Sequence, residues 1–294
     1  MNMKKKSFIA LPALALCAAF VLVGCFGKNG DKTAALMEAI ENNDVAKARQ
    51  AIDAGADMNA KVPYGNTTGT VLMKALVCYA PDVARLLIEM GADVNEKDDQ
   101  GKTALMRADD LPTDITTLLI AHGADVNARC NDGRTALMFA ANHYAAEAAG
   151  LLIKAGAHVD KRSYHSRDTA LMCAAYKDAA DVAKVLIESG ADVNAKNKYG
   201  TTALIQTTWN NAADVAKLLI ESGADMNARE HDGDTALIHA AWHKSAGVAK
   251  LLIEAGADVN ATDTDGKTNT AGLFEEELVF GCCYMRYESI PEGI

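Results

Sequence analysis

The stretch from Asp234 to Asn260 reads DTALIHAAWHKSAGVAKLLIEAGADVN, and variants of it recur along the chain. Its closing phrase, Gly-Ala-Asp-Val-Asn in this copy, recurs with small changes every 32 to 36 residues, beginning at Gly55, Gly91, Gly123, Gly156, Gly190, Gly223 and Gly256. Its opening phrase, Thr-Ala-Leu-Ile in this copy, recurs in register from Thr103, Thr135, Thr169, Thr202 and Thr235, with a variant from Thr70. The chain is therefore a tandem array of seven units, which we number 1 to 7.

Each unit predicts two helices. In unit 7, Thr235 is a good N-cap for a first helix whose alanines and leucine recur along one side. A second helix follows, with Val248, Leu251 and Leu252 on one apolar face, and Gly256 stands where a left-handed residue ends a helix. A single unit cannot bury both helices, so the units must stack on one another to fold.

A period near 33 residues with Thr-x-Leu at the start of each unit resembles the ankyrin repeat. The resemblance implies an all-α repeat solenoid over residues 33–267, in which each unit is a helix-turn-helix followed by a β-hairpin-like finger. Residues 268–294 depart from the pattern and are expected to form a divergent C-terminal cap or tail. The first helix of unit 3 is expected to be short, because one residue is missing around Asp109 to Pro112.

The chain begins with a segment of a different kind. Three lysines, Lys4 to Lys6, precede an apolar run from Phe8 to Val23 that is too short for a spanning helix of about 20 residues. The run ends in Leu22-Val23-Gly24-Cys25, which resembles the bacterial lipobox. An uncleaved anchor or an ordinary signal peptide is the alternative interpretation.

The lipobox resemblance implies that residues 1–24 are a lipoprotein signal peptide and that Cys25 carries a diacylglycerol thioether and further acyl chains such as palmitate. Residues 25–32 would then be a lipidated tether that holds the repeats at a membrane of the bacterial cell envelope. Phe26 after the cysteine favours the outer membrane over the inner one, with the repeats facing the periplasm or the cell surface.

In ankyrin architecture the ligand surface is the concave side, built from finger tips and from first-helix positions four, seven and eight after the capping Thr. Tyr176, Trp209 and Trp242 occupy the same position in units 5 to 7. Tyr and Trp often anchor interfaces, although packing of these rings into the core is the alternative. The predicted concave groove comprises Phe139, His143, Tyr176, Trp209, His239, Trp242 and His243.

Composition and motifs argue against several other functions. His239 and His243 have a spacing that can hold zinc, but no third ligand is evident and the flanking HAAWH lacks the glutamate of metalloproteases, so no metal site or cofactor is expected. The sequence contains no phosphate-binding loop or catalytic triad, so neither an enzyme nor a small-molecule substrate is expected. The net charge of −10 and the absence of a predominantly basic stretch argue against nucleic acid.

The sequence thus predicts a lipid-anchored envelope protein that binds another protein through its concave face. Two alternatives remain: a structural or surface-display lipoprotein without a specific ligand, and a secreted effector that acts on host proteins.

Overall fold

A computed structural model describes residues 30–108, 111–264 and 266 of the chain. The predicted signal peptide, Cys25 and the tail at 268–294 lie outside these residues. The elements, in chain order, are α1 (Gly30–Glu41), α2 (Val45–Asp53), β1 (Lys61–Tyr64), β2 (Thr67–Thr70), α3 (Val71–Val77), α4 (Pro81–Glu89), η1 (Ala104–Arg107), α5 (Thr113–Ala121), α6 (Ala136–Asn142), α7 (Ala146–Lys154), α8 (Ala170–Lys177), α9 (Ala180–Glu188), α10 (Ala203–Gln206), α11 (Ala213–Glu221), α12 (Ala236–Trp242) and α13 (Ala246–Glu254).

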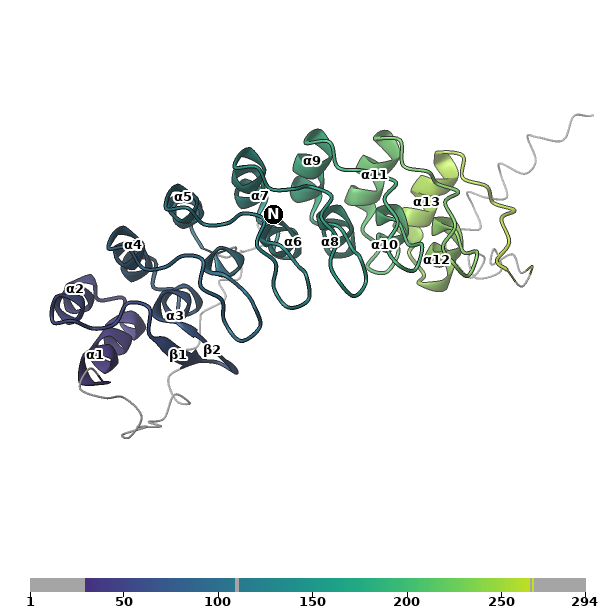
Figure 1. Cartoon of the computed structure of the whole chain (residues 1–294). Coiled ribbons are helices and arrows are strands. Elements are labelled where there is room, and N and C mark those ends of the chain that lie inside the picture. The colour runs from purple at the N-terminus through teal and green to yellow at the C-terminus, as the bar shows by residue number, and fades with distance from the viewer. Residues whose placement is uncertain (1–29, 109–110, 265, 267–294) are drawn as a thin grey trace, which may run out of the picture.

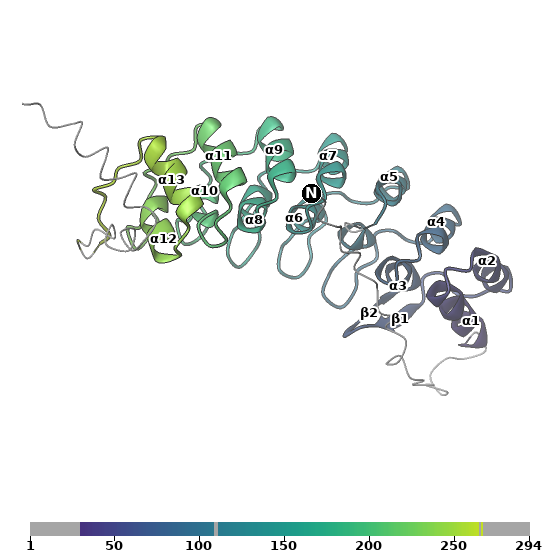
Figure 2. The ribbon, with the colours of Figure 1, turned by 180° about the vertical axis from the view of Figure 1, so that it is seen from behind.

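The helix pairs stack side by side into a curved solenoid, which confirms the predicted architecture. The second helices, α2, α4, α5, α7, α9, α11 and α13, form a row along the outer edge of the curve (Figure 1). The first helices and the fingers form the inner row, and the view from behind shows the same order (Figure 2). In the first finger, β1 and β2 pair antiparallel, with Lys61 opposite Thr70 and Tyr64 opposite Thr67. Among the described residues, no helix combines the length and apolar character needed to cross a membrane.

The core is a continuous apolar layer between the two rows of helices, from Leu36 to Ala257. Val248 and Leu252 of α13 are fully buried, as are Val215 and Leu219 of α11. In these two helices the preceding leucine of the Leu-Leu pair, Leu251 or Leu218, is only partly buried, although the sequence assigned Leu251 to the apolar face of unit 7. One step along a helix turns a side chain by about 100°, so the two leucines of a pair point in different directions. In α4, by contrast, Leu86 and Leu87 are both buried.

The predicted helix ends are largely confirmed. The hydroxyl oxygens of Thr70, Thr169, Thr202 and Thr235 accept a hydrogen bond from the backbone N–H three residues later, at 3.3–3.4 Å. Gly256, with φ +90°, adopts the left-handed conformation that ends α13. The first helix begins at Gly30, so the tether that the sequence extends to residue 32 is helical over its last residues.

Two first helices are shorter than the others. In unit 3 the expected short helix is a single turn of 3₁₀-helix, η1. In unit 6, α10 ends at Gln206, which the sequence analysis did not anticipate. The buried hydroxyls of Thr207 and Thr208 donate to the carbonyl oxygens of Leu204 and Ile205, at 2.6 and 2.8 Å, and thereby compete with helix continuation. Units 4, 5 and 7 have alanines at these positions.

Neighbouring units are joined through the residue that closes each repeated phrase, which is Asp160 in unit 4 and an asparagine in the other units. Its side-chain oxygen accepts a hydrogen bond, at 2.7–3.1 Å, from the backbone N–H of the third residue of the phrase in the next unit. The accepting residues are Asn59, Asn95, Asn127, Asp160, Asn194 and Asn227. The Asn95, Asn127 and Asn194 amides also donate to the glycine carbonyl of the next unit, at 2.9–3.3 Å. Asp160 of unit 4 has no amide to donate.

A second link between units lies at the turn between the two helices. The turn residue has a left-handed φ, for example 48° at Asn43 and 56° at Asp178. The side-chain oxygens of Asn43, Asp178 and Asn211 accept the N–H of Val83, Val215 and Val248, respectively, in the first turn of the next second helix. The Asn43 amide also donates to Asp82, at 3.0 Å.

Candidate functional site

The inner surface of units 5 to 7 carries a cluster of aromatic side chains, which we call the aromatic patch: Tyr176, Trp209, His239, Trp242 and His243. The Tyr176 and Trp209 rings meet edge to face with centroids 5.9 Å apart. The Trp209 ring meets the His239 and His243 rings in the same way, at 6.5 and 6.2 Å, and the two imidazoles stack at 5.8 Å. Offset and edge-to-face arrangements of this kind are the favourable ones.

Three rings of the aromatic patch are open to solvent. Tyr176, Trp209 and Trp242 are 40, 39 and 64% exposed, so the alternative that they pack into the core does not hold. Both tryptophans are exposed on the first-helix row, Trp242 at the end of α12 and Trp209 in the turn after α10. The early end of α10 places Trp209 in this turn, where the next residue, Asn210, donates from its side chain to the Tyr176 carbonyl at 2.6 Å.

Phe139 and His143, which the sequence assigned to the same groove, lie elsewhere. They line a pocket of about 400 Å³ on the inner surface of units 2 to 4. Phe139 is buried, with the Lys102 ammonium 5.1 Å and the Arg134 guanidinium 5.8 Å from its ring centroid. The structure therefore divides the predicted groove into the aromatic patch and this pocket, whose lining residues are Leu76, Val77, Tyr79, Lys102, Met106, Arg107, Leu111, Arg134, Phe139 and His143.

Beside the pocket, unit 3 contains a buried ionic network centred on Asp98. One carboxylate oxygen of Asp98 accepts from Arg107 at 2.6 Å and from the Tyr64 hydroxyl at 3.1 Å, and the other accepts the N–H groups of Gln100 and Lys102, both at 2.8 Å. Burial opposes ionisation of Asp98, but the hydrogen bonds from Arg107 and the backbone outweigh it and lower its pKa. Burial raises the pKa of Tyr64 above its usual range. Both oxygens of the Asp98 carboxylate therefore accept hydrogen bonds from within the chain.

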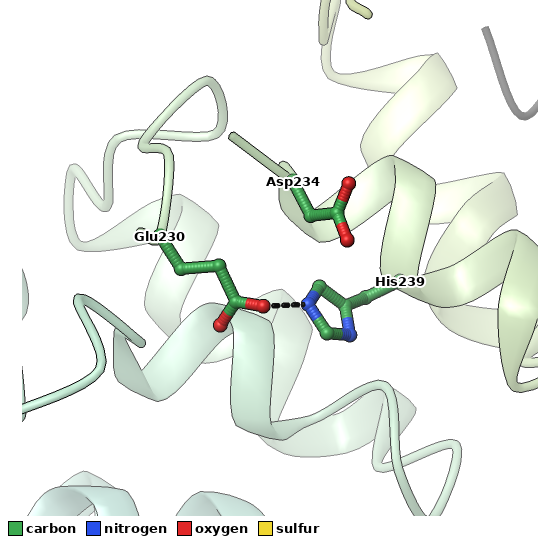
Figure 3. A group of neighbouring side chains, drawn as sticks. All are labelled: Glu230, Asp234 and His239. Atoms are coloured by element: carbon green, nitrogen blue, oxygen red, sulfur yellow. Dashed lines mark hydrogen bonds and ion pairs between the residues drawn. The ribbon is translucent and has the colours of Figure 1, made fainter. Parts of the chain in front are cut away.

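Unit 7 places a different set of side chains at the corresponding positions. Glu230 and Asp234 lie on the finger that leads into α12, and their carboxylates turn toward the His239 ring (Figure 3). The His239 Nε2 atom is 2.5 Å from Glu230 Oε1, and their side chains are only 13 and 12% exposed. One ligand atom from each of Glu230, Asp234 and His239 lies within 4.8 Å of the other two.

The spacing of His239 and His243 along one helix predicts no third ligand, whereas the structure brings the carboxylates of Glu230 and Asp234 to His239. The approach of Glu230 to His239 could have been found from the repeat register, because equivalent positions of two units carry an acid and a basic side chain at the same spacing. Glu230 precedes His239 by nine residues, as Asp98 precedes Arg107 in unit 3. His243 instead stacks on His239, and burial together with the His239 charge lowers its pKa.

Comparison with known proteins agrees with this architecture. A family model described as ankyrin repeats (3 copies) matches residues 36–130, 110–197 and 194–263, which together cover most of the chain. The human mitochondrial disaggregase is 37% identical over 89 residues, which are 29% of this chain and 12% of that protein. The bovine mitochondrial disaggregase is 37% identical over 83 residues, 28% of this chain and 12% of its own length. The chain thus matches only a small part of these relatives. With its seven units, stacked helix pairs and family match over most of its length, the chain belongs to the ankyrin-repeat family.

Proposed function

We propose that this chain binds its protein partner through the aromatic patch and is held at a bacterial envelope membrane by lipids on Cys25. Ankyrin repeats generally bind other proteins, because stacked repeats present an extended inner surface with few constraints on its side chains. The function is binding without catalysis. The observation that carries the proposal is the exposure of Tyr176, Trp209 and Trp242 on one surface of a rigid stack.

The aromatic patch has the properties of an interface anchor. Tryptophan and tyrosine contribute large apolar areas with few rotatable bonds, and they dominate the residues whose removal costs most binding energy. The Trp209 ring is already held by Tyr176, His239 and His243, so little side-chain entropy remains to be lost on binding. Exposed isolated tyrosines such as Tyr199 lack such a set of neighbours among the ring contacts of the described residues.

The charge of the chain favours a partner surface with basic residues. The chain carries a net charge of −10, and the faces of exposed Trp209 and Trp242 can receive a Lys or Arg side chain. Long-range attraction would speed the encounter at low ionic strength, and the aromatic rings would supply the contact energy. We therefore infer a partner segment that combines apolar and cationic side chains.

Photocrosslinking tests the binding surface. A photoreactive residue in place of Trp242 is expected to give one discrete adduct in envelope extracts, and the same residue in place of Lys217 on α11 is expected to give none. With the identified partner, Trp209→Ala should raise the Kd by about 30-fold or more, equivalent to about 2 kcal/mol. Tyr199→Ala, which removes an exposed ring outside the patch, is the matched control. A display protein without a ligand would give no discrete adduct at either position.

Labelling with a radioactive fatty acid tests the anchor. The full chain should incorporate the label and partition into the detergent phase, whereas Cys25→Ala should remain an unlabelled, unprocessed precursor. Labelling that persists in the Cys25→Ala variant would contradict the lipoprotein assignment and leave the binding proposal unaffected.

A further inference from the structure

The base of the last finger gathers two carboxylates around one imidazole in a largely buried position. Glu230 Oε1 faces His239 Nε2 at 2.5 Å, and its second oxygen, Oε2, accepts the Thr201 hydroxyl at 2.9 Å. A hydrogen bond to the far oxygen fixes the orientation of the carboxylate, as partners behind metal ligands usually do. Asp234 completes the set from the residue next to the N-cap of α12, and Figure 3 shows its carboxylate directed toward the same ring.

One oxygen of this set has no partner. Asp234 Oδ1 is shielded from solvent and makes no hydrogen bond within the described structure. A buried acceptor without a donor is costly, so its presence points to a missing positive group.

The corresponding sites of other units show how such a position is satisfied from within the chain. In unit 3 the Asp98 carboxylate is neutralised by Arg107 and by backbone N–H groups. In unit 6 the position holds neutral Asn197, whose oxygen accepts the N–H groups of Tyr199 and Thr201. Unit 7 has two carboxylates facing a single histidine, which leaves an excess of negative charge even when the histidine is protonated.

We propose that Glu230, Asp234 and His239 bind a divalent transition-metal ion of the zinc class. One imidazole nitrogen and two carboxylate oxygens are ligands that zinc accepts, and a hard ion such as calcium would require more oxygens than this set provides. The ion would replace the hydrogen bond between His239 and Glu230, and it would supply the partner that Asp234 Oδ1 lacks. Three protein ligands leave one coordination position open.

The ion site requires only groups of this chain, so it can be tested without the protein partner. It shares His239 with the aromatic patch, and the Trp209 ring centroid is 6.5 Å from that of His239. A paramagnetic ion such as Co²⁺ at the site should therefore quench Trp209 fluorescence. Trp209→Phe should reduce the quenching to the part contributed by Trp242, which lies on α12 with His239, and leave Co²⁺ binding itself intact.

Calorimetric titration of the full chain in detergent with Zn²⁺ tests the proposal. We expect one ion per chain, and a Kd at least about 100-fold weaker in Asp234→Asn and in His239→Gln, because each removes a ligand. His243→Gln, which removes the stacked imidazole and no ligand, should change the Kd less than about threefold. Zn²⁺ should also raise the melting temperature of the wild type and leave that of both ligand variants unchanged.

Two outcomes would overturn the site. The first is an absence of Zn²⁺ binding to the wild type at millimolar concentration. The second is binding that persists unchanged in both His239→Gln and Asp234→Asn, which would place the ion on cysteines or on other surface groups. Circular dichroism of each variant checks that it is folded, and Glu230→Gln replaces any variant that is not. Quenching by Co²⁺ that is lost in His239→Gln and kept in His243→Gln would support the site independently.

Discussion

Unit 3 and unit 7 occupy equivalent places in the repeat, although the first helix of unit 3 is a single 3₁₀ turn, and they differ in the side chains that they present. In unit 3 the acid at the finger base, Asp98, is paired with Arg107 and enclosed by hydrogen bonds, beside a pocket with a buried Phe139. In unit 7 the acid at the same position, Glu230, faces His239 next to exposed Trp209 and Trp242. The first arrangement stabilises its own finger. The second leaves polar groups and aromatic faces available to something outside the chain.

The comparison teaches that stability and recognition are assigned to different positions of the same repeat. The helix-helix core and the links between fingers recur from unit to unit with similar geometry, and a threonine caps the first helix in units 2, 5, 6 and 7. First-helix positions four, seven and eight vary. Their side chains decide whether the polar groups of a unit find hydrogen-bond partners within the chain or remain available for binding. The predictions below separate these two sets of positions.

The largest effect is expected in the shared core. Leu119 of α5 and Leu219 of α11 are equivalent and fully buried, so Leu119→Ala and Leu219→Ala should each lower the free energy of unfolding by about 2–5 kcal/mol. Leu218→Ala, one residue away and only partly buried, is the matched control and should cost less than half as much. Hydrogen exchange should show loosening first in the units flanking each substitution. Equal costs for Leu218 and Leu219 would contradict the assignment of the core face.

The next effect distinguishes unit 3 from unit 7. Arg107→Ala leaves the buried Asp98 carboxylate with only its other hydrogen bonds, and we expect a loss of about 2–3 kcal/mol at pH 7. The pKa of Asp98 is lowered in the native state, so its contribution is present above the unfolded pKa and is lost as the pH falls through the folded one. The penalty of Arg107→Ala should therefore shrink in acid. Trp242→Ala in unit 7, at an exposed position, should change stability by less than about 0.5 kcal/mol at either pH.

A smaller gain is expected at the turn of unit 5. Burial raises the pKa of Asp178 despite the hydrogen bond from Val215, and the charge of Asp214 adds to the shift. Its ionised form therefore costs stability above the raised pKa, and the cost disappears as the pH falls to the ordinary value. Asp178→Asn keeps the acceptor for Val215 and provides an amide for Asp214, as Asn43 does for Asp82. We expect a gain of about 0.5–1 kcal/mol at pH 7 and none near pH 3.

The control for this substitution is the reverse change at the next turn. Asn211→Asp introduces a carboxylate where a neutral amide now accepts from Val248, so it should lower the unfolding free energy at pH 7 by a similar amount. Chemical denaturation of both variants at the two pH values provides the measurement. A loss of stability in Asp178→Asn at pH 7 would show that the attraction of the carboxylate to the start of α11 outweighs its burial.

The smallest effect is expected at the junction of units 4 and 5. Asp160→Asn would add a donor for the Gly190 carbonyl, equivalent to the bond from Asn127 to Gly156, and should raise stability by about 0.5 kcal/mol. Asn127→Asp should remove that bond one unit earlier and lower stability by a similar amount. Denaturant midpoints for the two variants should move in opposite directions.

The fold could be predicted from the sequence because it depends on features that recur. Seven glycines in register, a capping threonine and an apolar face per helix determine the stack wherever several copies agree. The short first helix of unit 3 also followed, since a missing residue between two helices must shorten one of them. The common position of Tyr176, Trp209 and Trp242 indicated the inner surface but left packing into the core as an alternative, and the structure shows the three rings exposed.

The remaining features depend on side-chain contacts that the repeat pattern does not encode. Which leucine of each pair faces the core depends on the rotation of the whole helix, and hydrophobicity is the same for both. Phe139 looks like an interface residue by type, yet Lys102 and Arg134 fold over it. The approach of Glu230 and Asp234 to His239 depends on the finger folding back onto α12, and a spacing rule for histidines within one helix does not describe it.

The links between fingers have a mechanical consequence. Each side-chain bond from a closing residue reaches only the next unit, so a pulling force applied between the two ends of the stack passes through these junctions in series. The load on every junction is then equal, and the stack yields where a junction holds fewest bonds. Among the described residues, Asn59, Asp160 and Asn227 each form one such bond to the next unit, whereas Asn95, Asn127 and Asn194 each form two. Under tension the closing-residue links of units 1, 4 and 6 would therefore yield before those of units 2, 3 and 5.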